Sequence, residues 1–337
     1  MKSKNKKIGI LGAGSWGTAI SLVLNSNKHS VALWDKYKEN LDDIRNYSEN
    51  KKFLPGIKIP DGISVEYDLE KIIGLNEIIV FAVPAQHLRS VLSQISKNRF
   101  ENKLSVNLAK GIETSSLKLL SGVFTEFYGE DFLEKYCVLT GPSHAEEVSK
   151  FKPASLIAAS VNLKTAELVQ SSFTNRFFRV YTNSDLIGSE TGGAVKNIIA
   201  IAAGVCDGLN LGDNARAALI TRGLAEITRF GVKLGADERT FSGLSGLGDL
   251  VVTCGSVHSR NYKCGLLLSK NYSLDRIKNE INQTIEGIET VKSAFKLARK
   301  LDIDMPITQQ VFNLINGNIS AEAAVGQLME RLAKPEF

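Results

Sequence analysis

The sequence predicts an α/β fold: an N-terminal domain built on a mostly parallel β-sheet, followed by an all-helical C-terminal domain. Short apolar segments alternate with helix-period segments from Lys7 to about Tyr181, and strand signals stop after about Ser184. Such alternation is typical of parallel sheets, and unbroken Val/Ile/Leu segments are typical of strands buried on both faces. A chain of 337 residues, 43% of them hydrophobic, can build two cores. We expect one domain over residues 1–188 and a second over residues 189–337.

The predicted elements follow in chain order. Strands are expected at residues 7–12, 30–35, 77–83, 104–109, 136–141, 154–160 and 178–182. Helices between them are expected at residues 15–27, 86–95 and 115–129. The second domain is expected to contain helices at residues 193–206, 214–235, 285–301, 307–317 and 320–334.

Composition excludes several classes of protein. A net charge of +5 is mild and has no basic segment with interleaved aromatic residues, so we expect no nucleic-acid partner. No stretch reaches the roughly 20 apolar residues that span a bilayer, and glycines interrupt the apolar segment near the N-terminus, unlike a signal peptide. The four cysteines form no C-x-x-C pair, so we expect reduced thiols, no metal site and a cytoplasmic location.

The segment "IGILGAGSWGTA" carries G-x-G-x-x-G at Gly12, Gly14 and Gly17, after a predicted strand and at the start of a predicted helix. This context is that of the Rossmann dinucleotide-binding fingerprint. Gly12 permits the tight turn, Gly14 lets the backbone approach a pyrophosphate, and Gly17 permits close helix–strand packing. The amides of Ser15 and Trp16 would then face phosphate. The alternative is a glycine turn that binds nothing.

The end of the second predicted strand gives two conflicting signals. Asp35 stands where an acidic residue would bind the ribose 2′-hydroxyl, which favours NAD. Lys36 and Lys38 follow, and would attract a 2′-phosphate, which favours NADP, unless they only belong to a solvated loop. The preference between NAD(H) and NADP(H) stays open.

Further polar residues follow strand ends or sit among glycines. Lys110 follows the fourth strand, where open α/β sheets bind ligands, and Gly141, Ser143 and Ala145 follow the fifth. Ser143 is equally suited to cap a helix. Asp249 lies in "SGLGDL". The trio at Ser259, Arg260 and Asn261 suits a phosphate, unless it is a plain surface loop.

Lys196 lies in the middle of the apolar helix "TGGAVKNIIAIAAGVCDG". A buried ammonium needs a counter-charge, or a task that uses its proton. Asp249 is the candidate partner, and Lys110 and Arg260 are candidate cationic neighbours that would ease release of the proton. The alternative is a lysine whose stem packs while its head reaches water.

These residues resemble the bacterial NAD(P)-dependent sn-glycerol-3-phosphate dehydrogenases over nearly the whole chain. The resemblance rests on "GILGAGSWGTA", "NKKFLPGIKIP", "FAVPAQHLRSVL", "LAKGIE", "LTGPSHAEEV", "TFSGLSGLGDLVVTC", "SRNYKCG" and above all the long block from Phe178 through Lys196 to Arg229. It implies reversible reduction of dihydroxyacetone phosphate to sn-glycerol 3-phosphate, which feeds glycerophospholipid synthesis.

The resemblance also implies roles for individual residues. Lys196 would be the proton donor and acceptor. Substrate contacts would come from Lys110, Gly141, Ser143, Asp249, Ser259, Arg260 and Asn261. Cofactor contacts would come from Ser15, Trp16, Lys36, Phe53, Lys110, Ala145, Arg260, Thr284 and Glu286. Two positions depart from the family: Thr284 replaces a usual aliphatic residue, and Asp35 a usual basic or neutral one.

Two other functions stay open at this point. A related dehydrogenase acting on a β-hydroxy acid would also pair a Rossmann domain with a helical domain and use a lysine. A non-catalytic redox sensor would bind NADH and a partner protein. A homodimer is consistent with the apolar helices and with the resemblance, but the sequence leaves the oligomeric state open.

Overall fold

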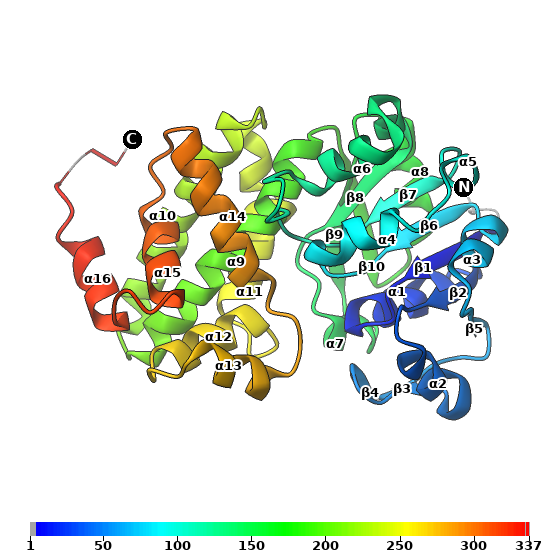
Figure 1. The fold of residues 1–337 in the computed structure, drawn as a ribbon, viewed down its shortest axis with the longest axis horizontal. Coiled ribbons are helices and arrows are strands. Elements are labelled where there is room, and N and C mark those ends of the chain that lie inside the picture. The colour runs from blue at the N-terminus through cyan, green and yellow to red at the C-terminus, as the bar shows by residue number, and fades with distance from the viewer. Residues whose placement is uncertain (1–4, 334, 337) are drawn as a thin grey trace.

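The computed structural model describes residues 5–333, 335 and 336, and shows two lobes side by side (Figure 1). The predicted fold class is confirmed: one lobe is built on a β-sheet and the other is helical. Residue 334, the end of the last predicted helix, lies outside the described residues, as do 1–4 and 337 at the ends of the two predicted domains. No helix in the described part of the chain is long and apolar enough to cross a membrane.

The strands are β1 (Lys7–Leu11), β2 (Ser30–Trp34), β3 (Glu49–Asn50), β4 (Leu54–Lys58), β5 (Ile63–Val65), β6 (Ile78–Phe81), β7 (Leu104–Asn107), β8 (Tyr136–Thr140), β9 (Ala154–Ala159) and β10 (Phe178–Asn183). The helices of the sheet lobe are α1 (Ser15–Ser26), α2 (Lys38–Tyr47), α3 (Leu69–Leu75), α4 (Leu88–Leu92), α5 (Lys97–Phe100), α6 (Leu120–Tyr128), α7 (Ala145–Val148) and α8 (Leu163–Phe173). The helices of the other lobe are α9 (Leu186–Gly208), α10 (Gly212–Lys233), α11 (Asp249–Cys254), α12 (Arg260–Leu268), α13 (Leu274–Ile281), α14 (Glu286–Lys300), α15 (Pro306–Ile315) and α16 (Ala321–Met329).

Eight strands form the main sheet in the order β10-β9-β8-β7-β6-β1-β2-β5. The neighbouring strands β8, β7, β6, β1, β2 and β5 are all parallel to one another. The carboxyl ends of β1, β2, β6, β7 and β8 therefore meet at one edge of the sheet. Their side chains are almost all buried, because helices cover both faces of the sheet. This edge faces the helical lobe and places the loops that follow five strands around one space.

Strand β9 departs from the parallel arrangement that continuous alternation suggests. It pairs antiparallel with β8, and β10 pairs parallel with β9. Parallel neighbours need a crossover that is usually a helix, and the link from β8 to β9 contains only the four-residue α7. The chain therefore turns back beside β8, and the last strand, β10, leads directly into α9.

Some local elements differ from the predicted ones. The helix expected from Ser115 begins only at Leu120, because the preceding loop is held by Glu113, whose carboxylate pairs with Arg89 and accepts from Ser116. The small β3–β4 hairpin beside α2 was not predicted, since its strands are short and lie outside the main sheet.

The helical lobe is built around α9, a 23-residue helix that is buried for most of its length. Helix α12 crosses it very closely: a Cβ on Gly204 would lie 2.0 Å from the carbonyl oxygen of Tyr262, and one on Gly265 2.0 Å from that of Ile201. Only glycine permits this approach. The crossing fixes the start of α12 against the middle of α9, where Lys196 lies.

Candidate functional site

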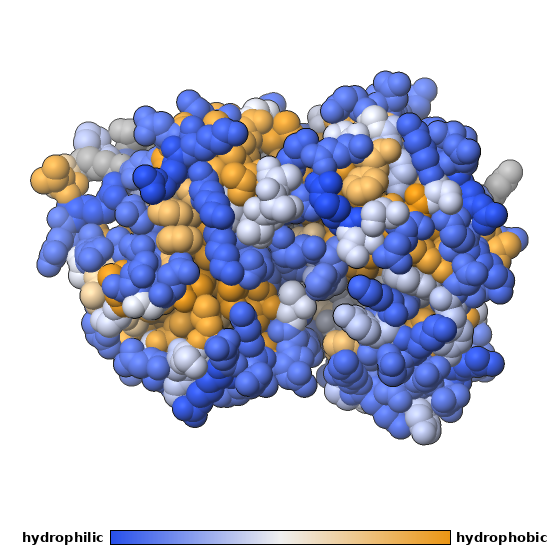
Figure 2. All heavy atoms as spheres, viewed as in Figure 1, coloured by the Kyte–Doolittle hydropathy of each residue, from blue (hydrophilic) through white to orange (hydrophobic). Residues whose placement is uncertain are grey.

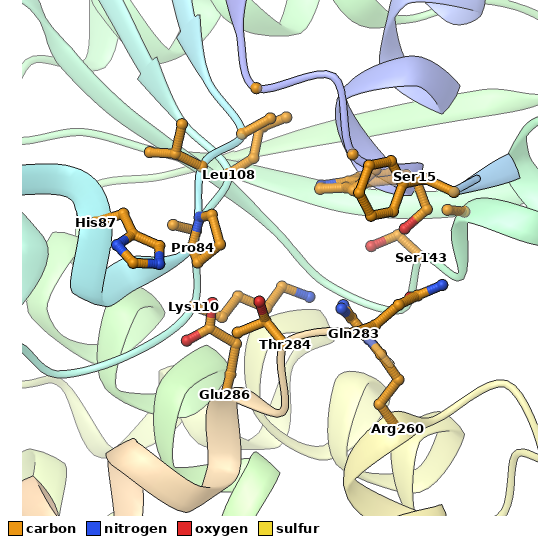
Figure 3. A pocket seen from close by; sticks show the side chains of 18 of the residues that line it. Ser15, Pro84, His87, Leu108, Lys110, Ser143, Arg260, Gln283, Thr284 and Glu286 are labelled. Carbon is orange, nitrogen blue, oxygen red and sulfur yellow. The ribbon is translucent and has the colours of Figure 1, made fainter. Parts of the chain in front are cut away.

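A cavity of about 510 Å³ lies where the two lobes meet, at the notch between them in Figure 2. Its walls come from the loop after β1, the carboxyl ends of β2, β6 and β7, and helices of the other lobe. Figure 3 shows Ser15 and Ser143 on the sheet side and Arg260 and Gln283 on the helical side. The predicted residues that line it are Gly12, Gly14, Ser15, Trp16, Asp35, Lys36, Phe53, Lys110, Ser143, Ala145, Lys196, Asp249, Ser259, Arg260, Asn261, Thr284 and Glu286.

The glycine loop has the geometry of a dinucleotide cradle. Gly12 has φ +110°, and a Cβ there would lie 2.8 Å from the Ala82 backbone. A Cβ on Gly17 would lie 2.0 Å from the Gly12 carbonyl oxygen, whereas a Cβ on Gly14 would meet nothing within 4 Å. Helix α1 starts at Ser15 with no side-chain cap and no acidic residue in its first turn. Its first N–H groups are therefore available for a pyrophosphate, and the loop fits the cofactor.

At the floor of the cavity, the ammonium groups of Lys196 and Lys110 both bind the carboxylate of Asp249. Lys196 Nζ donates to Asp249 Oδ1 at 2.5 Å and to Thr253 Oγ1 at 2.6 Å. Lys110 Nζ donates to Asp249 Oδ2 at 2.6 Å and to the Gly141 carbonyl oxygen at 3.0 Å. Asp249 is the first residue of α11 and only 1% exposed. The carboxylate therefore compensates the charge that the helix pattern left unexplained.

Burial and the neighbouring charges set the protonation of this group. Burial, with the nearby Lys110 ammonium, lowers the pKa of Lys196 to about 8, while Asp249 opposes the shift. Burial alone would raise the pKa of Asp249, but the Lys110 and Lys196 ammonium groups hold it below its ordinary value. A lysine that titrates near neutral pH can both donate and accept a proton at working pH.

The trio at 259–261 opens α12. Ser259 caps this helix, accepting the N–H of Tyr262 at 3.2 Å. Arg260 is largely buried at the cavity wall, and burial lowers the pKa of its guanidinium, although Glu286 and Glu146 oppose the shift. A guanidinium with this setting is suited to bind an anion that enters the cavity.

Asn261 lines the cavity and also connects three helices. It donates to Asn197 Oδ1 at 2.9 Å, and its own Oδ1 accepts the N–H of Gly287 at 2.9 Å. It therefore joins α12 to α9 and α14, and has one amide hydrogen left for a ligand.

Glu286 begins α14 and faces the sheet lobe (Figure 3). Its Oε1 accepts the N–H of Ala85 at 3.1 Å, while its Oε2 is buried with no hydrogen-bond partner. Burial raises the pKa of Glu286 to about 7, opposed by the Ala85 N–H and Arg260. Buried polar atoms normally have partners, so Oε2 is suited to receive a donor from a bound molecule. Thr284 lines the cavity beside it.

Two predicted residues do not line the cavity. Gly17 acts through packing, as described above. Gly141 has φ +137° and lies behind the wall, where its carbonyl oxygen accepts Lys110 Nζ and the Ser143 hydroxyl at 2.8 Å. It therefore orients two groups that do line the cavity.

Sequence reasoning missed other lining residues. Pro84 and His87 follow the carboxyl end of β6, so the strand-end rule that indicated Lys110 would also have found them. Thr253 lies one helical turn after Asp249, on the same face of α11, and its hydroxyl receives Lys196. His144 and His258, which the sequence already places next to predicted site residues, also line the cavity, with ring centroids 5.8 Å apart.

Comparison with known proteins gives one consistent result. The family model for the N-terminus of NAD-dependent glycerol-3-phosphate dehydrogenase matches residues 7–166, and the model for its C-terminus matches residues 185–326. The chain belongs to the NAD-dependent glycerol-3-phosphate dehydrogenase family. The resemblance stated from the sequence is thereby confirmed.

Individual members of this glycerol-3-phosphate dehydrogenase family show how close the likeness is. Over 332 residues the chain is 46% identical to the glycerol-3-phosphate dehydrogenase [NAD(P)+] of Bacillus velezensis, covering 98% of this chain and 96% of the relative. It is also 46% identical to that of Carboxydothermus hydrogenoformans, covering 98% of each. The crystal structure of glycerol-3-phosphate dehydrogenase from Coxiella burnetii superposes with a TM-score of 0.92 at 36% identity, over 97% of this chain and 99% of that one.

Proposed function

We propose that this protein catalyses the reversible NAD(P)H-dependent reduction of dihydroxyacetone phosphate to sn-glycerol 3-phosphate. The observation that carries the proposal is the buried Lys196–Asp249 pair in the same cavity as the glycine loop. A redox sensor has no use for a lysine held in this way, and membership of the family agrees with the reaction.

Lys196 handles the proton in this mechanism. The nicotinamide, when bound, supplies the hydride that reduces the C2 carbonyl carbon. Negative charge then builds on the carbonyl oxygen, where Lys196 Nζ stabilises it and donates its proton. Asp249 orients the ammonium and accepts from a substrate hydroxyl. In the reverse direction, neutral Lys196 accepts the proton of the C2 hydroxyl.

The remaining residues bind and orient. Arg260 and Asn261, with Ser259, hold the phosphate, and this anchors the carbonyl against the nicotinamide. Lys110 and Ser143 complete the substrate site, and the carbonyl oxygen of Gly141 orients both of them from behind the wall.

Residues of both lobes hold the cofactor. The glycine loop, with the N–H groups of Ser15 and Trp16, binds the pyrophosphate. Asp35, Lys36 and Phe53 lie on the adenosine side of the cavity. The last group of proposed contacts is Lys110, Ala145, Arg260, Thr284 and Glu286.

The test is the initial rate of loss of reduced-nicotinamide absorbance with dihydroxyacetone phosphate, measured with NADH and with NADPH. Oxidation with either cofactor supports the proposal. Oxidation only with β-keto acids would assign the protein to the hydroxy-acid enzymes. Cofactor binding without turnover of any of these substrates would favour a sensor.

We assign most cofactor contacts to residues 1–188 and most substrate contacts to residues 189–337, with the boundary near the start of α9. We also propose a cytoplasmic location, since the four cysteines are free and buried thiols, typical of a reducing compartment. The product would supply the glycerol phosphate backbone of glycerophospholipids.

We further propose a homodimer in which a second copy covers the apolar groove between α10, α15 and α16. This groove of about 560 Å³ is lined mainly by aliphatic side chains, and Leu211, Met329 and Leu332 are exposed at it. Figure 2 shows apolar side chains gathered on this lobe. A large exposed apolar patch is typical of an interface. The molar mass of the wild-type protein measured by light scattering should be twice the mass of the chain. Leu219→Glu, which places a charge inside the groove, should reduce the measured mass to that of one chain. A monomeric wild-type protein would contradict the proposal.

A further inference from the structure

Asp35 is held by three donors from three segments of the sheet lobe. It lies directly after the carboxyl end of β2 and lines the cavity. Its Oδ2 accepts the N–H of Ala13 in the glycine loop at 2.8 Å. Its Oδ1 accepts the N–H of Tyr37 at 2.9 Å and the side-chain amide of Asn40, on α2, at 3.0 Å. The carboxylate therefore has one fixed orientation.

This arrangement also clamps the glycine loop. The N–H of Ala13 donates to Asp35, and the carbonyl oxygen of Ala13 accepts Asn50 Nδ2 at 2.7 Å. Asn50 also donates to Thr18 Oγ1 at 2.8 Å. Rotating Asp35 out of the cavity would leave the donors on Ala13, Tyr37 and Asn40 without their acceptor, so the charge stays where a ligand would meet it.

The unused acceptor capacity of Asp35 discriminates between two ligands. A carboxylate has about four acceptor sites, and three are taken here, which leaves one on Oδ2. A ribose hydroxyl can donate a hydrogen bond to that site. A 2′-phosphate carries negative charge and no proton to donate for most of the time at neutral pH, so it meets a fixed like charge.

Lys36 is the opposing signal, and its setting is weaker. It also lines the cavity, but its side chain is exposed, and no hydrogen bond or ion pair holds it in the described structure. Lys38 is exposed too and does not line the cavity. Solvent and salt screen an exposed ammonium more than a partly buried, fixed carboxylate.

We propose that Asp35 makes this protein select NAD(H) over NADP(H), by accepting a ribose hydroxyl and repelling a 2′-phosphate. The proposal rests on the proposed dehydrogenase function for its biological meaning. It resolves the two conflicting signals that the sequence leaves open at Asp35 and Lys36.

The test is equilibrium binding of NADH and of NADPH without substrate, followed by energy transfer from tryptophan to the reduced nicotinamide. Trp16 and Trp34 both line the cavity, so their indole rings serve as the energy-transfer donors. The wild-type protein should bind NADH at least about tenfold more tightly than NADPH, which corresponds to about 1.4 kcal/mol. Asp35→Ser should shift the ratio of the two Kd values at least about tenfold toward NADPH.

Two further variants separate selection from support of the loop. Asp35→Asn keeps the shape and removes the charge, so it should also shift the ratio if Asp35→Ser does not fold. Asp42→Ser removes an exposed carboxylate of α2 that does not line the cavity, and should leave both Kd values unchanged. Equal or tighter wild-type binding of NADPH would overturn the proposal, as would both Kd values rising by one factor in the Asp35 variants.

The outcome is separate from that of the proposed reaction. Selective NADH binding without reduction of dihydroxyacetone phosphate would support the role of Asp35 and overturn the substrate assignment. Reduction of dihydroxyacetone phosphate with unchanged cofactor ratios in the variants would do the reverse.

Discussion

Lys196 Nζ lies 2.5 Å from Asp249 Oδ1, and both side chains are almost completely buried. The two residues are 53 positions apart and lie on different helices, α9 and α11. A buried ion pair is weak evidence of a contribution to stability, because desolvation offsets much of the attraction. Its position at the floor of the cavity supports the proposed chemical role instead.

Replacing the ammonium tests that use directly. Lys196→Met should lower kcat by about 10²–10⁴-fold, the usual contribution of a positioned acid or base. The Kd for NADH should change little, since the glycine loop is untouched. Lys292→Met, which removes a half-exposed lysine of α14, is the matched control and should retain full activity. A rate for Lys196→Met within a few fold of wild type would contradict the proposed role.

The lowered pKa of Lys196 predicts opposite pH profiles for the two directions. With a pKa of about 8, the ammonium is present below that pH and lost above it. Reduction needs the ammonium, so kcat/KM for reduction should be level below about pH 8 and fall above it. Oxidation needs the neutral amine, so kcat/KM for oxidation should rise as the pH approaches about 8. Measurement of both profiles with saturating cofactor checks this. A basic limb for reduction near the ordinary lysine pKa would contradict it.

Removing the negative charge of Asp249, which Lys196 and Lys110 share, should shift the pH profile of the reduction. Asp249→Asn removes the group that favours the charged form of Lys196, while Lys110 continues to disfavour it. The basic limb of reduction should therefore shift to lower pH, and kcat at neutral pH should fall by at least about tenfold. A loss of kcat with an unmoved limb would mean that Asp249 contacts substrate without tuning the lysine. Circular dichroism would verify that the variant folds.

The phosphate site is tested by Arg260→Lys. The change keeps a positive charge but removes the planar fork that can bind two phosphate oxygens. Loss of one charge-assisted hydrogen bond costs about 1.5–3 kcal/mol, so KM for dihydroxyacetone phosphate should rise about 10- to 150-fold. Lys263→Ala, at an exposed position of the same helix, should leave KM unchanged. An unchanged KM in Arg260→Lys would place the phosphate elsewhere.

Glu226 supports a stability prediction outside the site. Its buried carboxylate accepts the N–H groups of Ile307 and Thr308 at 2.8 Å each, and the Thr308 hydroxyl at 2.6 Å, at the start of α15. Glu226→Ala leaves these donors unpaired, so the free energy of unfolding should fall by about 2–5 kcal/mol. Chemical denaturation measures it, with the exposed Glu280→Ala as control. A change below about 0.5 kcal/mol would contradict the capping role.

Local patterns in the chain determined the fold class, the glycine loop and the helix around Lys196. Each depends on residues within about ten positions of one another: apolar periodicity for the strands and for α9, and glycine spacing for the turn after β1. The same short-range logic located Lys110 at a strand end. It also identified Asp249 as the candidate partner of Lys196 and Arg260 as a candidate cationic neighbour, but it gave no distance or orientation for either.

The geometry of these pairings, and the second ammonium on Asp249, were decided by the tertiary structure alone. Asp249 receives Lys196 and also Lys110, which is 139 positions away, because the sheet edge and α11 meet across the interlobe cavity. The orientation of Asp35 likewise depends on the approach of the glycine loop and α2 to the end of β2. The reversal of β9 follows from the short link that precedes it. Sequence patterns describe neighbours along the chain, whereas charge pairing and cofactor selection depend on distances that exist only once separate segments have packed together.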